Sequence, residues 1–247
     1  TVTVNVVAAQ DPGTDASVTV CGSGTAFNLT DSLGGTPAPG GSWTAPGGAA
    51  HNDVFDPAVD ANGVYTYTVA AGTACEAAAT VTVAVQVPAA NAGVDQALCI
   101  GDTVQLGATG GTTFLWSPGA TLNDVNIADP LAFPLATTTY TVSVTDGLGC
   151  IAWDSMVVTV NPLPVVNAGA DAAICAGAST SLGGTPTGPS GSTYQWSPGA
   201  GLNNTTTANP TAQPVGTTTY TVLVTDGNQC SASDSVTVTV NPLPSID

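Results

Sequence analysis

The sequence predicts an all-β protein built as a tandem array of three β-sandwich domains. Long segments occur twice: NAGVDQALC, LWSPGATL and TTTYTVSVTDGLGC, starting at residue 91, return from residue 167 as NAGADAAIC, QWSPGAGL and TTTYTVLVTDGNQC. Matching landmarks are offset by 76 residues at Cys99 and Cys175 and by 80 at Trp116 and Trp196. A looser version precedes both copies. A period of this size indicates separate small domains in series rather than one catalytic globule.

Runs of alternating Thr and Val or Tyr predict the strands. β-Branched and aromatic residues at period two are typical of half-buried strands, with Val or Tyr facing inward. We expect such strands over residues 17–20, 65–69, 80–85, 138–145 and 235–240. Asp146-Gly147 and Asp226-Gly227 predict hairpin turns. About six to eight short strands in each repeat predict a sandwich of two sheets.

The repeat boundaries follow from Pro-containing joints, QVPAANAGVD and NPLPVVNAGAD. We expect repeats over residues 11–87, 88–164 and 165–247, with the first of a divergent type. Residues 1–10 read as the closing strand of a preceding repeat or as a donated strand. Proline stiffens such joints, and sandwiches of about 25–30 Å in series predict a rod of roughly 100 Å.

The six cysteines fall two in each repeat, at equivalent points. Zinc ligation needs four ligands at short spacing, and no such cluster exists. We therefore expect one disulfide in each repeat, which would stabilise it by roughly 4 kcal/mol in the chain-entropy model. Disulfides of this kind indicate an oxidising compartment, either the cell exterior or a periplasm. The expected pairs are Cys21 with Cys75, Cys99 with Cys150, and Cys175 with Cys230.

The charge balance excludes several classes of function. The chain has no Lys or Arg and 17 acidic residues, for a net charge of −17. Nothing here neutralises phosphate, which excludes nucleic acid as a partner, and anionic membrane surfaces repel the chain. No stretch of 18 apolar residues exists, so we expect no membrane insertion. His51 is the sole histidine, no GxSxG motif appears, and we expect no enzymatic activity, with His51 in an exposed loop.

The aromatic residues that recur at fixed positions are expected to anchor the cores. The alternative for the tryptophans is an exposed surface that stacks on sugar rings. The expected anchors are Trp43, Trp116, Trp196, Tyr140 and Tyr220.

Calcium is the one metal ion that the sequence suggests as a bound partner, and nothing in the sequence requires a cofactor. Asp-rich loops on an anionic chain offer the oxygen ligands that this hard cation prefers. Turn and capping roles explain the same acids, so both interpretations stay open. The recurring candidate ligands are Asp95, Asp146 and Asp154 in one repeat and Asp171, Asp226 and Asp234 in the next.

The pattern NAGxD…C…WSP…TTTYTVxVTDxxxC…DSVTVTVNPLP resembles the immunoglobulin-like, PKD-type repeats of giant surface adhesins in Bacteroidetes, including gliding-motility adhesins exported by type IX secretion. The resemblance covers residues 88–247, and residues 11–87 resemble a companion repeat type. It implies immunoglobulin-like sandwiches on a bacterial cell surface. The family's O-glycan acceptor, Asp-Ser/Thr followed by an aliphatic residue, matches at Ser32, Thr103, Ser155 and Ser235.

These observations favour a non-enzymatic spacer or adhesin stalk. Its partners would be neighbouring repeats of the same polypeptide or like subunits in a filament, with polysaccharide or a solid surface as further candidates. The first alternative is a self-assembling filament subunit joined by strand donation from residues 1–7. The second is a carbohydrate-binding module, which requires exposed aromatic residues.

Overall fold

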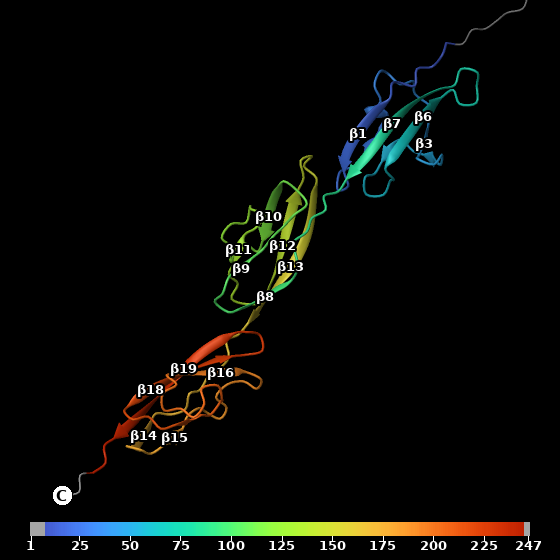
Figure 1. Cartoon of the computed structure of the whole chain (residues 1–247). Helices are drawn as coiled ribbons and strands as arrows, with labels where there is room; N and C mark the ends of the chain where they lie inside the picture. The colour runs from blue at the N-terminus through green and yellow to red at the C-terminus, as the bar shows by residue number, and fades with distance from the viewer. Residues whose placement is uncertain (1–7, 245–247) are drawn as a thin grey trace, which may run out of the picture.

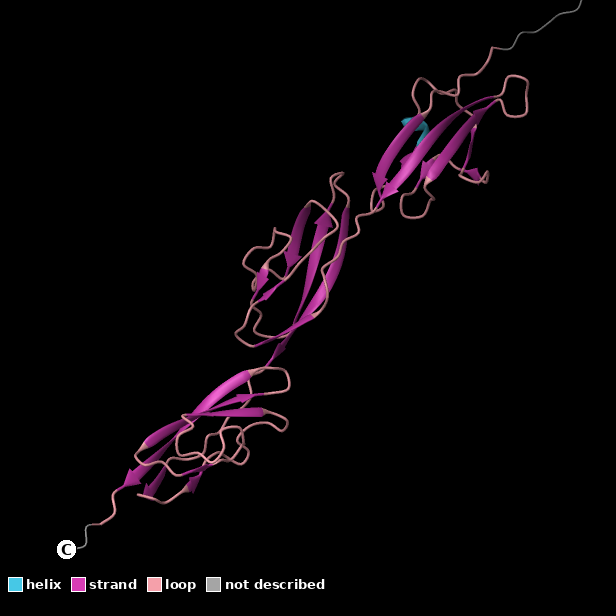
Figure 2. Cartoon of the chain, in the orientation of Figure 1, coloured by secondary structure: helices cyan, strands magenta, loops and turns pink. Residues whose placement is uncertain are grey.

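The computed structural model describes residues 8–244 and shows three β-rich repeats in series along an elongated molecule (Figure 1). The strand expected over residues 1–7 lies outside the described residues. Within the described part, the one helical element is a short 3₁₀ turn, η1 (Leu29–Ser32), in the first repeat (Figure 2). No helix in residues 8–244 has the length and apolar character needed to cross a membrane.

The first repeat holds a five-stranded sheet in the order β1-β7-β6-β3-β4 and a two-stranded ladder of β2 and β5. Its strands follow the Thr/Val alternation, with Tyr65, Tyr67 and Val69 buried on one face of β6. The strands are β1 (Ala16–Cys21), β2 (Phe27–Asn28), β3 (Ser42–Thr44), β4 (Ala50–His51), β5 (Val54–Phe55), β6 (Gly63–Val69) and β7 (Ala77–Gln86).

The second and third repeats share one topology, a four-stranded sheet facing a two-stranded ladder. The sheet order is β10-β12-β13-β8 in the second repeat and β16-β18-β19-β14 in the third. The second contains β8 (Gln96–Cys99), β9 (Val104–Gln105), β10 (Thr113–Ser117), β11 (Leu131–Ala132), β12 (Thr138–Thr145) and β13 (Ile151–Asn161). The third contains β14 (Ala172–Cys175), β15 (Thr180–Ser181), β16 (Thr193–Ser197), β17 (Thr211–Ala212), β18 (Thr218–Thr225) and β19 (Ser231–Asn241).

In every repeat the first strand pairs in parallel with the last strand. β1 runs beside β7, β8 beside β13, and β14 beside β19. Because the last strand leads into the following joint, the first strand also points toward that joint. The cysteine at its end therefore lies at the face where the chain leaves the repeat, which we call the exit face.

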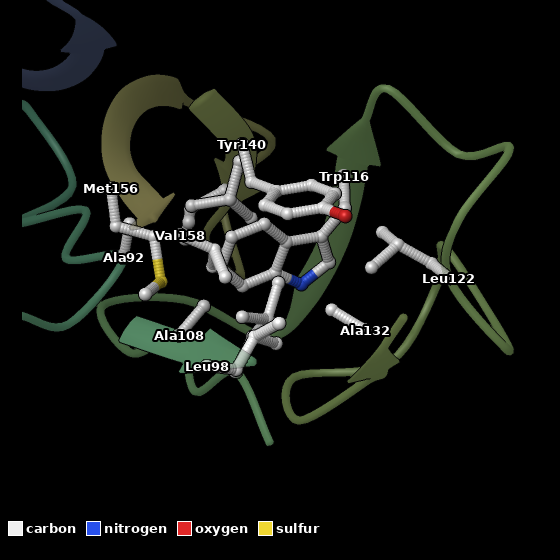
Figure 3. Close-up of a cluster of buried hydrophobic side chains, with 12 residues drawn as sticks. Ala92, Leu98, Ala108, Trp116, Leu122, Ala132, Tyr140, Met156 and Val158 are labelled. Atoms are coloured by element: carbon white, nitrogen blue, oxygen red, sulfur yellow. The ribbon is translucent and has the colours of Figure 1, made fainter. Parts of the chain in front are cut away.

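Each repeat has its own hydrophobic core around one tryptophan. Trp116 lies in the middle of the second core, beside Tyr140, Met156 and Val158 (Figure 3). It is 2% exposed, and its indole N–H donates to the Ile127 carbonyl at 3.0 Å. Burying a side chain of this size contributes at least about 3 kcal/mol of transfer free energy, and the hydrogen bond satisfies its one polar atom.

The other expected anchors occupy equivalent places. Trp196 donates to the Thr207 carbonyl at 3.0 Å, and the hydroxyl of Tyr220 donates to the Ala200 carbonyl at 2.8 Å. Burial raises the pKa of the Tyr220 phenol. Trp43 of the first repeat is also buried. The three tryptophans expected as anchors thus lie inside sandwiches, and their indole faces are not available to stack on sugars.

Candidate functional site: the joints between repeats

The exit face of each repeat presents one cysteine beside the end of the last strand. In the first repeat, Cys21 ends β1 opposite Gln86, the final residue of β7. The chain then turns, with the Gly22 N–H donating to the Gln86 carbonyl at 2.9 Å and the Gly24 N–H donating to the Cys21 carbonyl at 2.9 Å. In the second repeat, Cys99 takes the same place opposite Asn161.

The opposite face, where the chain enters a repeat, carries the second cysteine in a tight hairpin turn. Between β12 and β13, the Asp146 carboxylate accepts N–H groups of Leu148 and Cys150, each at 2.9 Å. The Asp146 N–H donates in turn to the Cys150 carbonyl at 3.0 Å. Asp226 holds Asn228 and Cys230 in the same way in the third repeat. We call this the entry face.

The structure joins exit and entry faces of neighbouring repeats by disulfides. Cys21 bonds to Cys150 with a Cα–Cα distance of 5.1 Å, and Cys99 bonds to Cys230 with 5.5 Å. Cys75 and Cys175 are unpaired and exposed, and residues 8–244 include all six cysteines. The expectation of one disulfide inside each repeat is therefore wrong. Each bond instead adds a second covalent connection across a joint.

The physical reason is the length of the sandwich. Cys99 lies opposite one end of β13, and Cys150 directly precedes the other end. An 11-residue strand rises about 33 Å between its ends. A disulfide needs Cα atoms within about 7 Å. The length of β13 is several times that limit, which excludes a bond between Cys99 and Cys150. The hairpin cysteine of the next repeat, Cys230, lies directly beside Cys99.

Side chains from both repeats line the grooves at these joints. The first joint is lined by Pro57, Gln86 and Val87 of the first repeat and by Ile151 and Trp153 of the second. Trp153 is 63% exposed. Unlike the core tryptophans it does not recur, because Ser233 takes its place in the third repeat. The second joint is lined by residues around Cys99, including Asp102 and Val104, and by Asn228 and Gln229 of the hairpin.

The carboxylates considered as calcium ligands hold separate backbone amides. Asp95 accepts the Val157 N–H at 2.8 Å, and Asp154 accepts the Ala92 N–H at 2.8 Å. These bonds tie the start of the repeat to its last strand, and Asp146 holds the hairpin turn instead. Asp171, Asp226 and Asp234 repeat all three roles. Within residues 8–244, no group of three or more His, Cys, Asp or Glu side chains is placed to hold a metal ion.

One of these carboxylates has a shifted pKa. The N–H groups of Ala92 and Ser155 hold the pKa of Asp154 below its usual value, with Ala92 contributing most, because both donate to the ionised form. The shift in pKa is caused by a structural hydrogen bond. The recurrence of this aspartate as Asp234 in the next repeat therefore reflects the register between the first segment of each repeat and its last strand.

The sole histidine lies in the first repeat, at the end of β4, and is half-buried rather than in an exposed loop. Its ring meets the Tyr65 ring edge-on at 4.9 Å, and its Nε2 lies 3.3 Å from an Asp60 oxygen. The pKa of Asp60 is lowered, first by the N–H of Asp56 and then by His51, against an opposing effect of burial. This arrangement fixes a loop of the sandwich and includes no nucleophile.

The four candidate glycosylation residues are spread over all three repeats. Thr103, Ser155 and Ser235 are exposed, and Ser32 is half-buried at the end of η1. Ser155 and Ser235 lie at equivalent places on β13 and β19. Their modification remains a prediction.

Comparisons with solved structures return proteins built of several domains in series. Extracellular domains 3–5 of Drosophila OTK match over 94% of this chain and 96% of theirs, at 11% identity and a TM-score of 0.35. An I-band fragment of titin matches over 96% and 100%, at 12% identity and a TM-score of 0.38. The eight N-terminal Ig domains of Down Syndrome Cell Adhesion Molecule match over 94% and 36%, at 13% and 0.41.

Each repeat is a β-sandwich made of a larger sheet and a two-stranded ladder. The identities and TM-scores of these matches are too low to carry a fold family or a function across. No family model and no curated protein matches the sequence.

Proposed function

We propose that this chain is a non-enzymatic structural segment of an extracellular protein, acting as a stiff spacer or adhesin stalk. The observation that carries the proposal is the double connection at each joint, made by the polypeptide and by the Cys21–Cys150 or Cys99–Cys230 bond. A single linker lets two domains bend and twist about it. A second covalent connection restricts both motions.

The disulfides also support a location outside the cell, because they persist in oxidising compartments. A chain without Lys or Arg has no basic side chain with which to bind nucleic acid or anionic membranes, which argues against both as partners. The sequence resemblance supports the finer proposal of a bacterial cell-surface adhesin. Neighbouring repeats of the same polypeptide or like subunits would be its partners, with polysaccharide or a solid surface at its tip.

Small-angle X-ray scattering tests the proposal on the oxidised chain. A compact particle of this length has a radius of gyration of about 18 Å, whereas a rod of roughly 100 Å has about 30 Å. We expect the larger value. A quadruple variant, C21S/C99S/C150S/C230S, should keep the circular dichroism of folded repeats but scatter as a flexible chain of domains. C75S/C175S is the matched control and should scatter like the unmodified chain. A compact oxidised particle, or equal flexibility in both variants, contradicts the proposal.

A further inference from the structure

The two internal joints pair their cysteines in the same way, and two of the six cysteines remain unpaired. The exit-face cysteine of one repeat bonds to the entry-face cysteine of the next, as Cys21 to Cys150 and Cys99 to Cys230. Cys175 is the exit-face cysteine of the third repeat, and Cys75 is the entry-face cysteine of the first. These are complementary halves of the same kind of bond.

The backbone around Cys175 is already arranged as at a completed joint. Cys175 pairs in register with Asn241, the last residue of β19, as Cys99 does with Asn161. The Ala176 N–H donates to the Asn241 carbonyl at 2.9 Å, and the Ala178 N–H donates to the Cys175 carbonyl at 2.9 Å. The turn after Cys99 has the same two hydrogen bonds, at 2.9 and 3.0 Å. The thiol of Cys175 is thus presented by the same turn that presents a bonded cysteine in the preceding repeat.

Cys75 lies at the corner where the hairpin cysteines of the other repeats form their bonds. It stands between β6 and β7, two residues before β7 begins. Its turn is longer than the others, and its N–H donates to the Thr73 hydroxyl at 3.2 Å. Beside it lies a hollow lined by Ala8, Gln10, Ala70 and Thr73. Figure 1 shows this loop at the outer end of the first repeat.

The bonded hairpin cysteines differ from Cys75 in their exposure to solvent. Cys150 is 2% exposed and Cys230 is fully buried, and each is bonded to a cysteine of a neighbouring repeat. Cys75 and Cys175 are exposed. Their exposure is what an uncovered joint face would show on either side.

We propose that Cys175 of one copy of this chain bonds to Cys75 of a second copy, head to tail, at a third joint of the same kind. The occupant is a second copy because each copy carries both halves, and because the new contact continues the interface already formed at the two internal joints. Such a heterologous contact repeats without closing and builds a linear assembly. The inference rests on the proposed stalk function and deepens it by naming how stalk segments join.

The bond-forming step needs an oxidant, for which a small-molecule disulfide such as oxidised glutathione suffices. The Cys75 thiolate attacks glutathione disulfide, forming a mixed disulfide and releasing one glutathione thiolate. The Cys175 thiolate of the other copy then attacks the Cys75 sulfur and expels the second glutathione as its thiolate. Two cysteine thiols are oxidised and one glutathione disulfide is reduced to two thiols, so electrons and protons balance.

Complementary single variants test the direction of the bond. C75S retains Cys175 and C175S retains Cys75, and neither change touches an internal joint. In a glutathione redox buffer, we expect the unmodified chain to form a ladder of multimers on a non-reducing gel. Each variant alone should stay a monomer, and their equimolar mixture should stop at the dimer. Random thiol collisions would make only half of those dimers mixed, and we expect nearly all of them to be mixed.

Two outcomes overturn the proposal: an unmodified chain that stays monomeric, or single variants that dimerise as readily as their mixture. Peptide mapping of the dimer must find Cys75 linked to Cys175, and symmetric links would also overturn it. Scattering from the monomer separates this test from that of the stalk. A rod-like monomer that forms no multimers overturns the head-to-tail bond alone, whereas a compact monomer overturns the stalk.

Discussion

Trypsin cleavage at an engineered joint tests whether the disulfides cross between repeats. The chain contains no Lys or Arg, so a single arginine creates a single cleavage site. Val165 suits this purpose because it is 84% exposed, lies between β13 and β14, and is followed by Val166 rather than proline. Cleavage of V165R after residue 165 divides the 24.0 kDa chain into two pieces of about 16 and 8 kDa.

The two pieces should stay together until they are reduced. All trypsin experiments use a C75S/C175S background, which removes the two unpaired thiols and so prevents bonds between copies. The Cys99–Cys230 bond spans the cut, so the cleaved protein should run on a denaturing gel as one species of about 24 kDa without dithiothreitol and as two species with it. If Cys99 paired with Cys150 and Cys175 with Cys230, the pieces would separate without reductant. That result would refute the assignment of the joints.

The matched control is V165R carrying C99S/C230S, whose pieces should separate after cleavage alone. The same pair of serines also measures the energetic weight of the bond in the uncut chain. Its two cysteines are 131 residues apart, and closing a loop of this size stabilises the folded state by up to about 5 kcal/mol in the chain-entropy model. Urea unfolding should show a loss within that limit.

Trp196→Ala should cost about 3–5 kcal/mol in urea unfolding, because it empties the third core, whereas Trp153→Ala at an exposed site should change stability by less than about 0.5 kcal/mol; equal losses would contradict the assigned cores. The lowered pKa of Asp154 stabilises the fold above the unfolded-state pKa of about 3.9, and this contribution is lost as pH falls through the lower folded-state pKa. Asp154→Asn should therefore show a smaller fall in melting temperature than the unmodified chain between pH 4 and 2, and an unchanged fall would argue against the Ala92 hydrogen bond. Because the carboxylates already hold backbone amides, melting should be the same in excess calcium and in chelator, and a calcium-dependent rise would reveal a site that the described residues do not show.

Most of the fold could be predicted from local patterns. Alternating Thr and Val or Tyr predicted the long strands, since a period of two places one set of side chains on one face. The recurring tryptophans and tyrosines were expected in the cores, where they lie. Asp146 and Asp226 were expected at hairpin turns, and each accepts two backbone amides there. These features depend on neighbours close in sequence.

The carboxylates of Asp95 and Asp154 show where local patterns stop. Their partners, Val157 and Ala92, lie 62 residues away in sequence. Nothing in a local motif distinguishes an acid that binds a distant amide from one that binds a cation. The expectation that His51 lies in an exposed loop is wrong for a similar reason. Its contacts with Tyr65 and Asp60 depend on how the first sandwich closes.

The sequence by itself determined that the chain is a series of β-sandwiches with two cysteines in each. It could not determine which cysteines bond, because moving every partner along by one repeat leaves the periodic pattern equally regular. Only the tertiary structure decided this. The parallel pairing of the first and last strands places the two cysteines of one repeat at opposite ends of a long sandwich. A disulfide is too short to span that length, so each disulfide joins cysteines of neighbouring repeats instead.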